Sequence, residues 1–122
     1  MLIWVSALHC EAKPVIDFYR LKKSHEDNAF DLYRGDNMAC IISGIGKLAS
    51  AAASAWIAAR YEDAASIAWI NLGIAGAASY ELGAIFALNQ VIDADSEKSL
   101  RFELPLRYIR PETAQAQPEG VA

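Results

Sequence analysis

Three short segments follow apolar, strand-like runs, and each carries residues that could contact a ligand. They are Ala7-Leu8-His9-Cys10-Glu11, Ser43-Gly44-Ile45-Gly46-Lys47 and Asn71-Leu72-Gly73-Ile74-Ala75-Gly76. In an open α/β sheet, the carboxyl ends of neighbouring parallel strands meet at one edge, where such folds bind ligands. We therefore expect the three segments to gather there and form a site.

Glu11 is the candidate for a catalytic side chain. A carboxylate near a strand end that points into an apolar pocket can take a proton from water as a general base. The same carboxylate at the start of a helix interacts favourably with the helix dipole. Both roles stay open for Glu11. His9 could line the same pocket, although a partly buried, hydrogen-bonded histidine is the plainer interpretation.

The segment from Ser43 to Lys47 has several interpretations. A P-loop is excluded, because Ile41 and Leu48 stand where that motif needs glycine and serine or threonine. A dinucleotide fingerprint fits in form, but the acidic partner expected after the next strand is replaced by Asn71. The glycines can simply permit a tight strand-to-helix turn. They can also leave backbone N–H groups at a helix start free to face a ligand.

Alternating apolar runs and turn residues predict the elements that must position these segments. We expect strands over Leu2–Leu8, Ser66–Leu72 and Leu82–Ala94, with Ser66–Leu72 central and parallel and Leu82–Ala94 entered through a turn at Gly83. We expect one helix that begins near Glu11, with Pro14 tolerated in its first turn, and a second over Lys47–Arg60, which is rich in alanine. A polar connection over 22–28 and a hairpin, from Phe30–Tyr33 through Gly35–Asn37 into Met38–Ile42, complete the pattern.

The character of the chain changes after Asp95. Three of the 4 prolines, Pro105, Pro111 and Pro118, fall beyond that point. We expect one domain over 1–95, an extra strand within 96–112, and a disordered tail over 113–122, where large apolar residues are nearly absent.

Composition limits the classes of function. The chain has 122 residues, a net charge of -4 and no basic patch typical of nucleic-acid binding. No apolar run reaches the roughly 18 residues of a membrane span, and the first eight residues read as a strand, so we expect a cytoplasmic protein. Its 54% hydrophobic content predicts apolar surface buried against another chain, and we expect a homodimer. Cys10 and Cys40 read as reduced core or near-core thiols, and nothing predicts a metal or another cofactor.

The order and residue sequences of the three segments resemble motifs of the purine nucleoside phosphorylase and nucleosidase superfamily, most closely those of its 5'-methylthioadenosine/S-adenosylhomocysteine nucleosidase branch. The segment ending at Glu11 resembles Gly-Ala-Met-Glu-Glu-Glu, and the segment over 71–76 resembles Asn-Thr-Gly-Ser-Ala-Gly. Farther on, Gly83-Ala84-Ile85 and the stretch 91–95 resemble a strand bordering the pocket, but the usual aspartate and histidine are Ala84 and Ile92.

The resemblance implies an α/β fold of three layers, the phosphorylase/hydrolase-like fold, in which helices flank a mixed, mostly parallel sheet. It implies that Glu11 activates the attacking water. It also implies that the bound purine nucleoside contacts Ser43, Gly44, Ile45, Gly46, Ile74, Ala75 and Gly76. The phosphorylase branches usually carry arginine at the position of Asn71, so Asn71 favours hydrolysis of the N-glycosidic bond over phosphorolysis. Ile74 replaces a serine, which removes one polar contact.

The resemblance covers residues 1–95, which correspond to the N-terminal half of the family's domain. The family's Met-Glu segment, base-stacking aromatic residue and aspartate acid come from the second half, and no such motifs follow residue 95. We therefore expect a nucleosidase-like protein truncated to its first half, with weak or absent cleavage. The alternatives are a non-catalytic nucleoside-binding or dimerisation module and a truncated or frame-altered product of a longer nucleosidase gene.

Overall fold

The computed structural model describes residues 1–26, 29–61 and 63–101, and it divides into two compact units. The first unit is Met1–Gly76 and the second begins at Ala77, so the boundary lies within the predicted 1–95 segment. The tail predicted over 113–122, and residues 102–112 of the segment predicted to contain an extra strand, lie outside the described residues. None of the described helices is long and apolar enough to cross a membrane.

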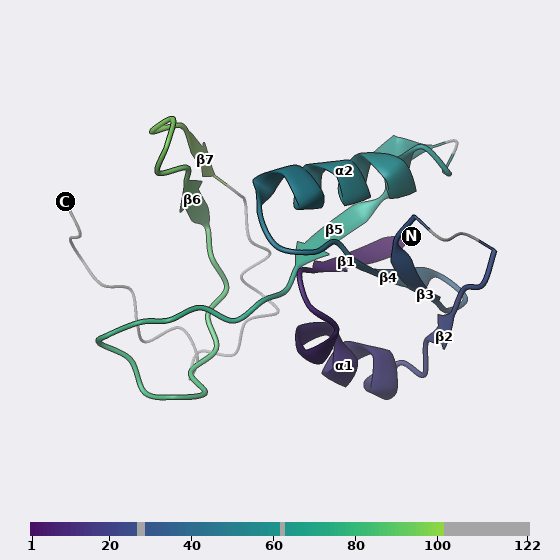
Figure 1. Ribbon diagram of the computed structural model, residues 1–122, viewed down its shortest axis with the longest axis horizontal. Coiled ribbons are helices and arrows are strands. Elements are labelled where there is room, and N and C mark those ends of the chain that lie inside the picture. The colour runs from purple at the N-terminus through teal and green to yellow at the C-terminus, as the bar shows by residue number, and fades with distance from the viewer. Residues whose placement is uncertain (27–28, 62, 102–122) are drawn as a thin grey trace. The chain divides into compact units, whose positions relative to one another are not determined.

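The first unit is an α/β structure built on a mixed sheet of five strands (Figure 1). In sheet order the strands are β2 (Lys22–Lys23), β3 (Asp31–Arg34), β4 (Met38–Ile42), β1 (Leu2–Ser6) and β5 (Ala68–Asn71). The central strand β1 runs parallel to both β4 and β5, whereas β2, β3 and β4 pair antiparallel. Since the chain passes from β4 over β1 to β5, the sheet has a switch point beside β1.

Two helices cover opposite faces of this sheet, α1 (His9–Phe18) on one and α2 (Lys47–Ala58) on the other (Figure 1). Successive residues of β1 and β4 alternate between the two faces. Ile3 and Ile41 pack on the α2 side with Ala53 and Ile57. Cys40 packs on the α1 side with a buried cluster from α1 and the residues after it: Ala12, Val15, Ile16 and Leu21. The sheet therefore supports one apolar core on each face.

The first helix begins earlier than the sequence predicted. It starts at His9 instead of Glu11, because the Glu11 carboxylate accepts a hydrogen bond from the Leu8 backbone N–H and so stabilises a start before it. Pro14 consequently lies beyond the first turn, where its missing N–H leaves the Cys10 carbonyl without a helical donor. The helix ends at Phe18 in a Schellman motif, in which Leu21 donates to the Ile16 carbonyl.

The hairpin and the alanine-rich helix agree with prediction. Strands β3 and β4 pair antiparallel across the turn at Gly35–Asn37, and α2 covers 47–58. A Cβ on Gly35 would lie 2.9 Å from Leu21 Cδ2. The turn can therefore lie this close to the core because residue 35 has no side chain. The small residues of α2 let the helix lie close to the sheet, where Ala53 and Ile57 are fully buried.

Three expectations of secondary structure are wrong. Lys22 and Lys23 form a short strand instead of an irregular connection, because they pair with Tyr33 and Arg34 at the hairpin edge. The strand β5 is apolar, but in the described sheet it is an edge strand, paired only with β1. The strand predicted over Leu82–Ala94 shrinks to β6 (Gln90–Ile92).

The described part of the second unit contains one small sheet. There β6 pairs antiparallel with β7 (Ser99–Arg101), and Asp93 accepts a backbone bond from Glu97 in the intervening turn. Most of the apolar run from Leu82 to Asn89 adopts no regular structure. A strand needs a neighbour to bond its N–H and C=O groups, and in the described residues this run has none.

Candidate functional site

The carboxyl ends of β1, β4 and β5 meet at one edge of the sheet, as the three segments predicted. The backbone N–H of Ser43 donates to the Ser6 carbonyl at 2.8 Å, and that of Gly44 donates to the Ala7 carbonyl at 3.1 Å. On the other side of β1, the buried hydroxyl of Ser6 donates to the Leu72 carbonyl at 2.9 Å. These bonds hold the three strand-to-loop transitions together.

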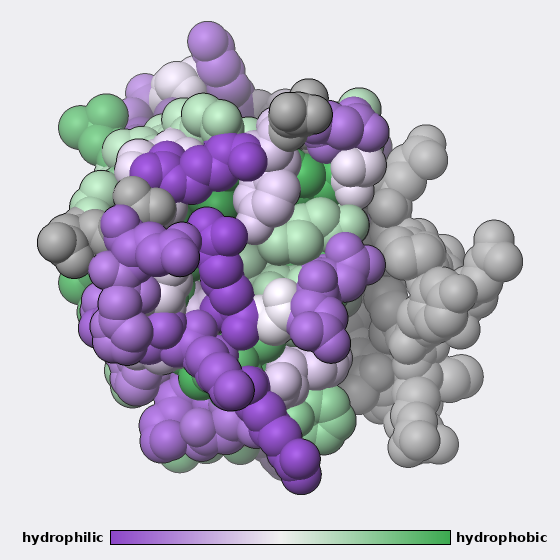
Figure 2. All heavy atoms as spheres, turned by 90° about the vertical axis from the view of Figure 1, so that its right-hand side faces the viewer, coloured by the Kyte–Doolittle hydropathy of each residue, from purple (hydrophilic) through white to green (hydrophobic). Residues whose placement is uncertain are grey.

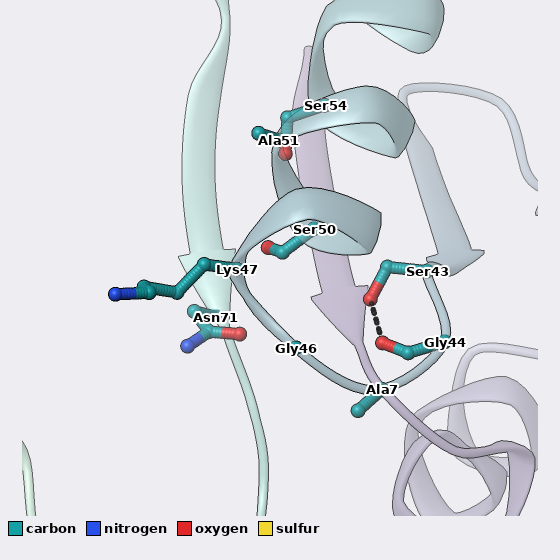
Figure 3. Close-up of a pocket in the computed structure, with 9 residues that line it drawn as sticks. All are labelled: Ala7, Ser43, Gly44, Gly46, Lys47, Ser50, Ala51, Ser54 and Asn71. Atoms are coloured by element: carbon teal, nitrogen blue, oxygen red, sulfur yellow. Dashed lines mark hydrogen bonds between the residues drawn. The ribbon is translucent and has the colours of Figure 1, made fainter.

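An open pocket of about 510 Å³ lies at this edge (Figure 3). Its lining comes from the ends of the three parallel strands and from the first two turns of α2. The lining residues are Ala7, Ser43, Gly44, Gly46, Lys47, Ser50, Ala51, Ser54 and Asn71. Pockets of this size accommodate small organic ligands.

The glycine-containing loop before α2 leaves the first backbone N–H groups of the helix accessible to a ligand. Gly46 precedes the helix with φ 100°, a left-handed conformation that glycine adopts without strain, and no side chain caps the helix. The first backbone N–H to make the regular i→i−4 helical bond is that of Ser50, which donates to the Gly46 carbonyl at 3.0 Å. The amides before it have no helical acceptor, and Gly44 and Gly46 carry no side chains to block their approach to a ligand.

Beyond Lys47 of the predicted segment, α2 contributes two polar side chains, Ser50 and Ser54, that were not predicted for the site. Lys47, Ser50 and Ser54 line the pocket from one face of α2 (Figure 3). The signal was present in the sequence, because positions i, i+3 and i+7 share one face of a helix and these three are polar in an alanine-rich segment. With Asn71, the face offers hydroxyl, ammonium and amide groups, which suit a ligand bearing several hydroxyl or anionic oxygen atoms.

Ser43 adds a buried hydroxyl at the base of the pocket. The residue is 7% exposed, and its hydroxyl donates to the Gly44 carbonyl at 2.8 Å, with the Ser6 carbonyl a second acceptor at 3.3 Å. A hydroxyl has one proton but two lone pairs. Ser43 can therefore hold the glycine turn and still accept a hydrogen bond from a ligand.

Glu11 joins two of the predicted segments through its carboxylate. One oxygen, Oε2, accepts from the Leu8 N–H at 3.0 Å, and Oε1 accepts from the Ile74 N–H at 3.1 Å. A Cβ placed on Gly73 would lie 3.6 Å from Oε1, so the segment after β5 passes close to the carboxylate. The side chain thus bridges the start of α1 and the loop that leaves β5.

The predicted contacts divide into two groups. Ser43, Gly44 and Gly46 line the pocket, whereas Glu11, Ile45, Ile74, Ala75 and Gly76 are not among its described lining residues. Ile45 and Ile74 are 78% and 83% exposed. Within the second group, Glu11 contacts Ile74 through the hydrogen bond from the Ile74 N–H, so the carboxylate belongs to the loop after β5 and not to the pocket lining.

The remaining candidates lie outside this arrangement. His9 is exposed, and its ring lies 5.6 Å from the Tyr33 ring, so the expectation of a partly buried histidine is wrong. Cys40 is a buried free thiol as expected, and burial raises its pKa to about 11. Cys10 is exposed in the first turn of α1, so the expectation of a core or near-core thiol is wrong for this residue. Within the described ranges, no group of three or more His, Cys, Asp or Glu side chains could hold a metal ion.

Comparison with protein-family models, curated proteins and solved structures finds no match to this chain. Any functional assignment therefore depends on the residues and on the geometry of the sheet edge.

Proposed function

We propose that the chain provides part of a nucleosidase-like site, which cleaves the N-glycosidic bond of a purine nucleoside by hydrolysis. The proposal includes the three-layer fold of the nucleoside phosphorylase superfamily. The observation that carries it is the Glu11 carboxylate, which bonds the backbone N–H groups of Leu8 and Ile74 at the strand edge that also holds the polar pocket.

In this mechanism Glu11 acts as the general base. Water attacks the anomeric carbon of the sugar while the carboxylate takes a proton from the water, and the purine departs with the bonding electron pair. The pocket hydroxyls of Ser43, Ser50 and Ser54 suit hydrogen bonds to sugar hydroxyl groups. Asn71, at the pocket wall, lacks the charge of the arginine that the phosphorylase branches usually carry at this position, and on this difference the proposal favours water as the attacking group.

A protonated group must meet the departing purine, and the pocket supplies no carboxylic acid among its described lining residues. Acid–base assistance is worth about 10²–10⁴-fold in rate. We therefore expect slow cleavage by this chain alone.

A second candidate is a nucleoside-binding module without catalysis. Its support is that each Glu11 oxygen already accepts a backbone N–H and that Glu11 is absent from the described pocket lining. A carboxylate used in this way holds α1 against the loop after β5. In this alternative, the exposed apolar side chains, such as Leu48 at 88% exposure, contact a second copy in a dimer.

The deciding experiment measures purine release from a panel of purine nucleosides, with and without phosphate. Glu11→Gln is compared with the wild-type chain and with Asp17→Asn, which removes an exposed carboxylate from the same helix. Hydrolysis is supported if purine release is lost in Glu11→Gln, is retained in Asp17→Asn and is the same with and without phosphate. Saturable nucleoside binding with no release, together with a dimer by light scattering, supports the binding module, and neither binding nor release rejects both.

A further inference from the structure

A second pocket, remote from the one described above, lies where α1 meets the hairpin edge of the sheet. It encloses about 340 Å³ and is lined by Tyr19, Arg20, Lys22, Arg34, Gly35 and Asp36. Three of these side chains are cationic and one is anionic, in a chain whose net charge is -4. Figure 2 looks onto the side of the molecule that carries β2 and β3, where hydrophilic side chains lie around smaller hydrophobic areas.

The three cations have no carboxylate partner within 4 Å among the described residues. The contrast with the neighbouring lysine is direct, because Lys23 Nζ lies 2.7 Å from Asp31 Oδ1. Asp36 shares the pocket, but it forms no such ion pair with any of the three in the described part of the chain. The cationic groups are therefore available to an anion.

The pairing of the strands brings two of these charges together. Lys22 of β2 is the direct cross-strand partner of Arg34 of β3. Like charges directly opposite one another destabilise a pair of strands. An anion bound between them converts this repulsion into two favourable contacts.

Arg20 occupies a position that normally favours glycine. It is the residue after the helix C-cap, and its backbone has φ 52°, in the left-handed region. A cation near a helix C-terminus interacts favourably with the helix dipole. This interaction alone can explain why a positively charged residue stands at position 20. The helix dipole does not explain the positive charges of Lys22 and Arg34, because these two residues lie on strands of the sheet.

We propose that this pocket binds the phosphate group of a small phosphorylated molecule. Guanidinium groups bond phosphate oxygens in pairs, and lysine adds a compact charge. The Tyr19 hydroxyl can donate a further hydrogen bond. The volume suits a small ligand, and a single cluster of three cations in an acidic chain is too small for a nucleic-acid track.

The test titrates the complete chain with inorganic phosphate, and separately with glycerol 3-phosphate, while backbone amide NMR shifts are recorded. Saturable shifts centred on residues 19–22 and 34–36 are expected. Tighter binding of the ester than of inorganic phosphate would support a small phosphorylated molecule as the ligand, whereas equal binding of the two would overturn that assignment in favour of free phosphate. An absence of saturable shifts for both ligands would overturn the proposal.

Charge-matched variants separate a built site from diffuse attraction. Arg34→Gln should weaken binding by about tenfold or more, because charge-assisted hydrogen bonds are lost. Lys13→Gln removes an equal charge from an exposed ion pair and should change affinity by less than about twofold. Equal losses in both variants would overturn the proposal. Lys22→Gln repeats the comparison at the partner strand if Arg34→Gln fails to fold by circular dichroism.

Discussion

The unit Met1–Gly76 and the described residues after it differ sharply in burial, although both contain long apolar stretches. In the first unit, Ile3, Ile41 and Ile57 are fully buried between the sheet and a helix. From Ala77 to Arg101 no described residue is buried, and Leu82 and Ile85 are 104% and 79% exposed. Apolar composition produced a core only where five strands supplied neighbours, because a two-stranded ribbon alone is marginally stable.

The largest expected effect tests this contrast directly. Ile41→Ala should lower the free energy of unfolding by about 2–5 kcal/mol, because it leaves a cavity at a fully buried position of β4. Val91→Ala shortens a side chain on β6 that is 48% exposed and should change stability by less than about 0.5 kcal/mol. Urea unfolding followed by circular dichroism measures both. Equal effects would mean that the two regions share one cooperative core.

A smaller effect is expected where the first unit ends. Glu11→Gln should destabilise it by about 1–2 kcal/mol, because the amide nitrogen of glutamine is a donor and would face the N–H of either Leu8 or Ile74. Asp17→Asn is the matched control, since it disturbs an exposed pair with Lys13 and should cost less than about 0.5 kcal/mol. Faster hydrogen exchange of the Ile74 amide in Glu11→Gln would show where the contact is lost. Unchanged exchange would contradict the bridging role.

The hairpin turn gives a test of close packing within the first unit. Gly35→Ala should cost about 1 kcal/mol, because the new Cβ would lie 2.9 Å from the Leu21 side chain and displace it. Gly76→Ala is the control, since a Cβ there meets nothing within 4 Å. In a double-mutant cycle with Leu21→Ala, most of the cost should disappear. If Gly35→Ala is equally destabilising in the Leu21→Ala background, the destabilisation comes from the backbone of the turn and not from the contact with Leu21.

Much of the first unit was predictable because its signals are local. The apolar run of β1, the turn glycine of the hairpin and the alanines of α2 each specify an element through propensity and period. The gathering of three segments at one edge followed from the parallel strand rule. The polar face of α2 was missed because Ser50 and Ser54 look unremarkable until the helix lies beside the strand ends.

The differences from prediction have other causes. Whether Leu82–Ala94 becomes a strand, and whether β5 is central, depends on distant partners and not on local pattern. The start of α1 depended on one side chain, since the bond from Leu8 to the Glu11 carboxylate moved it forward to His9. The basic pocket was not predicted, because the register that sets Lys22 opposite Arg34 is a tertiary feature.

The smallest expected effect concerns the two thiols, which reproduce the contrast between buried and exposed residues within one unit. Burial raises the pKa of Cys40 from 9.0 to about 11. Above pH 9 the unfolded chain releases this proton while the folded chain keeps it, so stability falls as pH rises from about 9 toward 11. The loss attributable to Cys40 should be below about 1 kcal/mol at pH 9.5.

The check compares the pH slope of unfolding free energy in three proteins between pH 8 and 9.5. Cys40→Ala removes the titrating group, so the pH slope of its unfolding free energy should be shallower than that of the wild-type chain. The cavity left by the substitution lowers the unfolding free energy equally at every pH and does not change the slope. Cys10→Ala removes an exposed thiol and should keep the wild-type slope. Thiol labelling gives an independent measure, because the thiolate is the reactive form and Cys40 should react far more slowly than Cys10. Similar labelling rates for the two thiols would mean that the α1 face of the sheet opens readily, and the contrast in burial would then not describe the protein in solution.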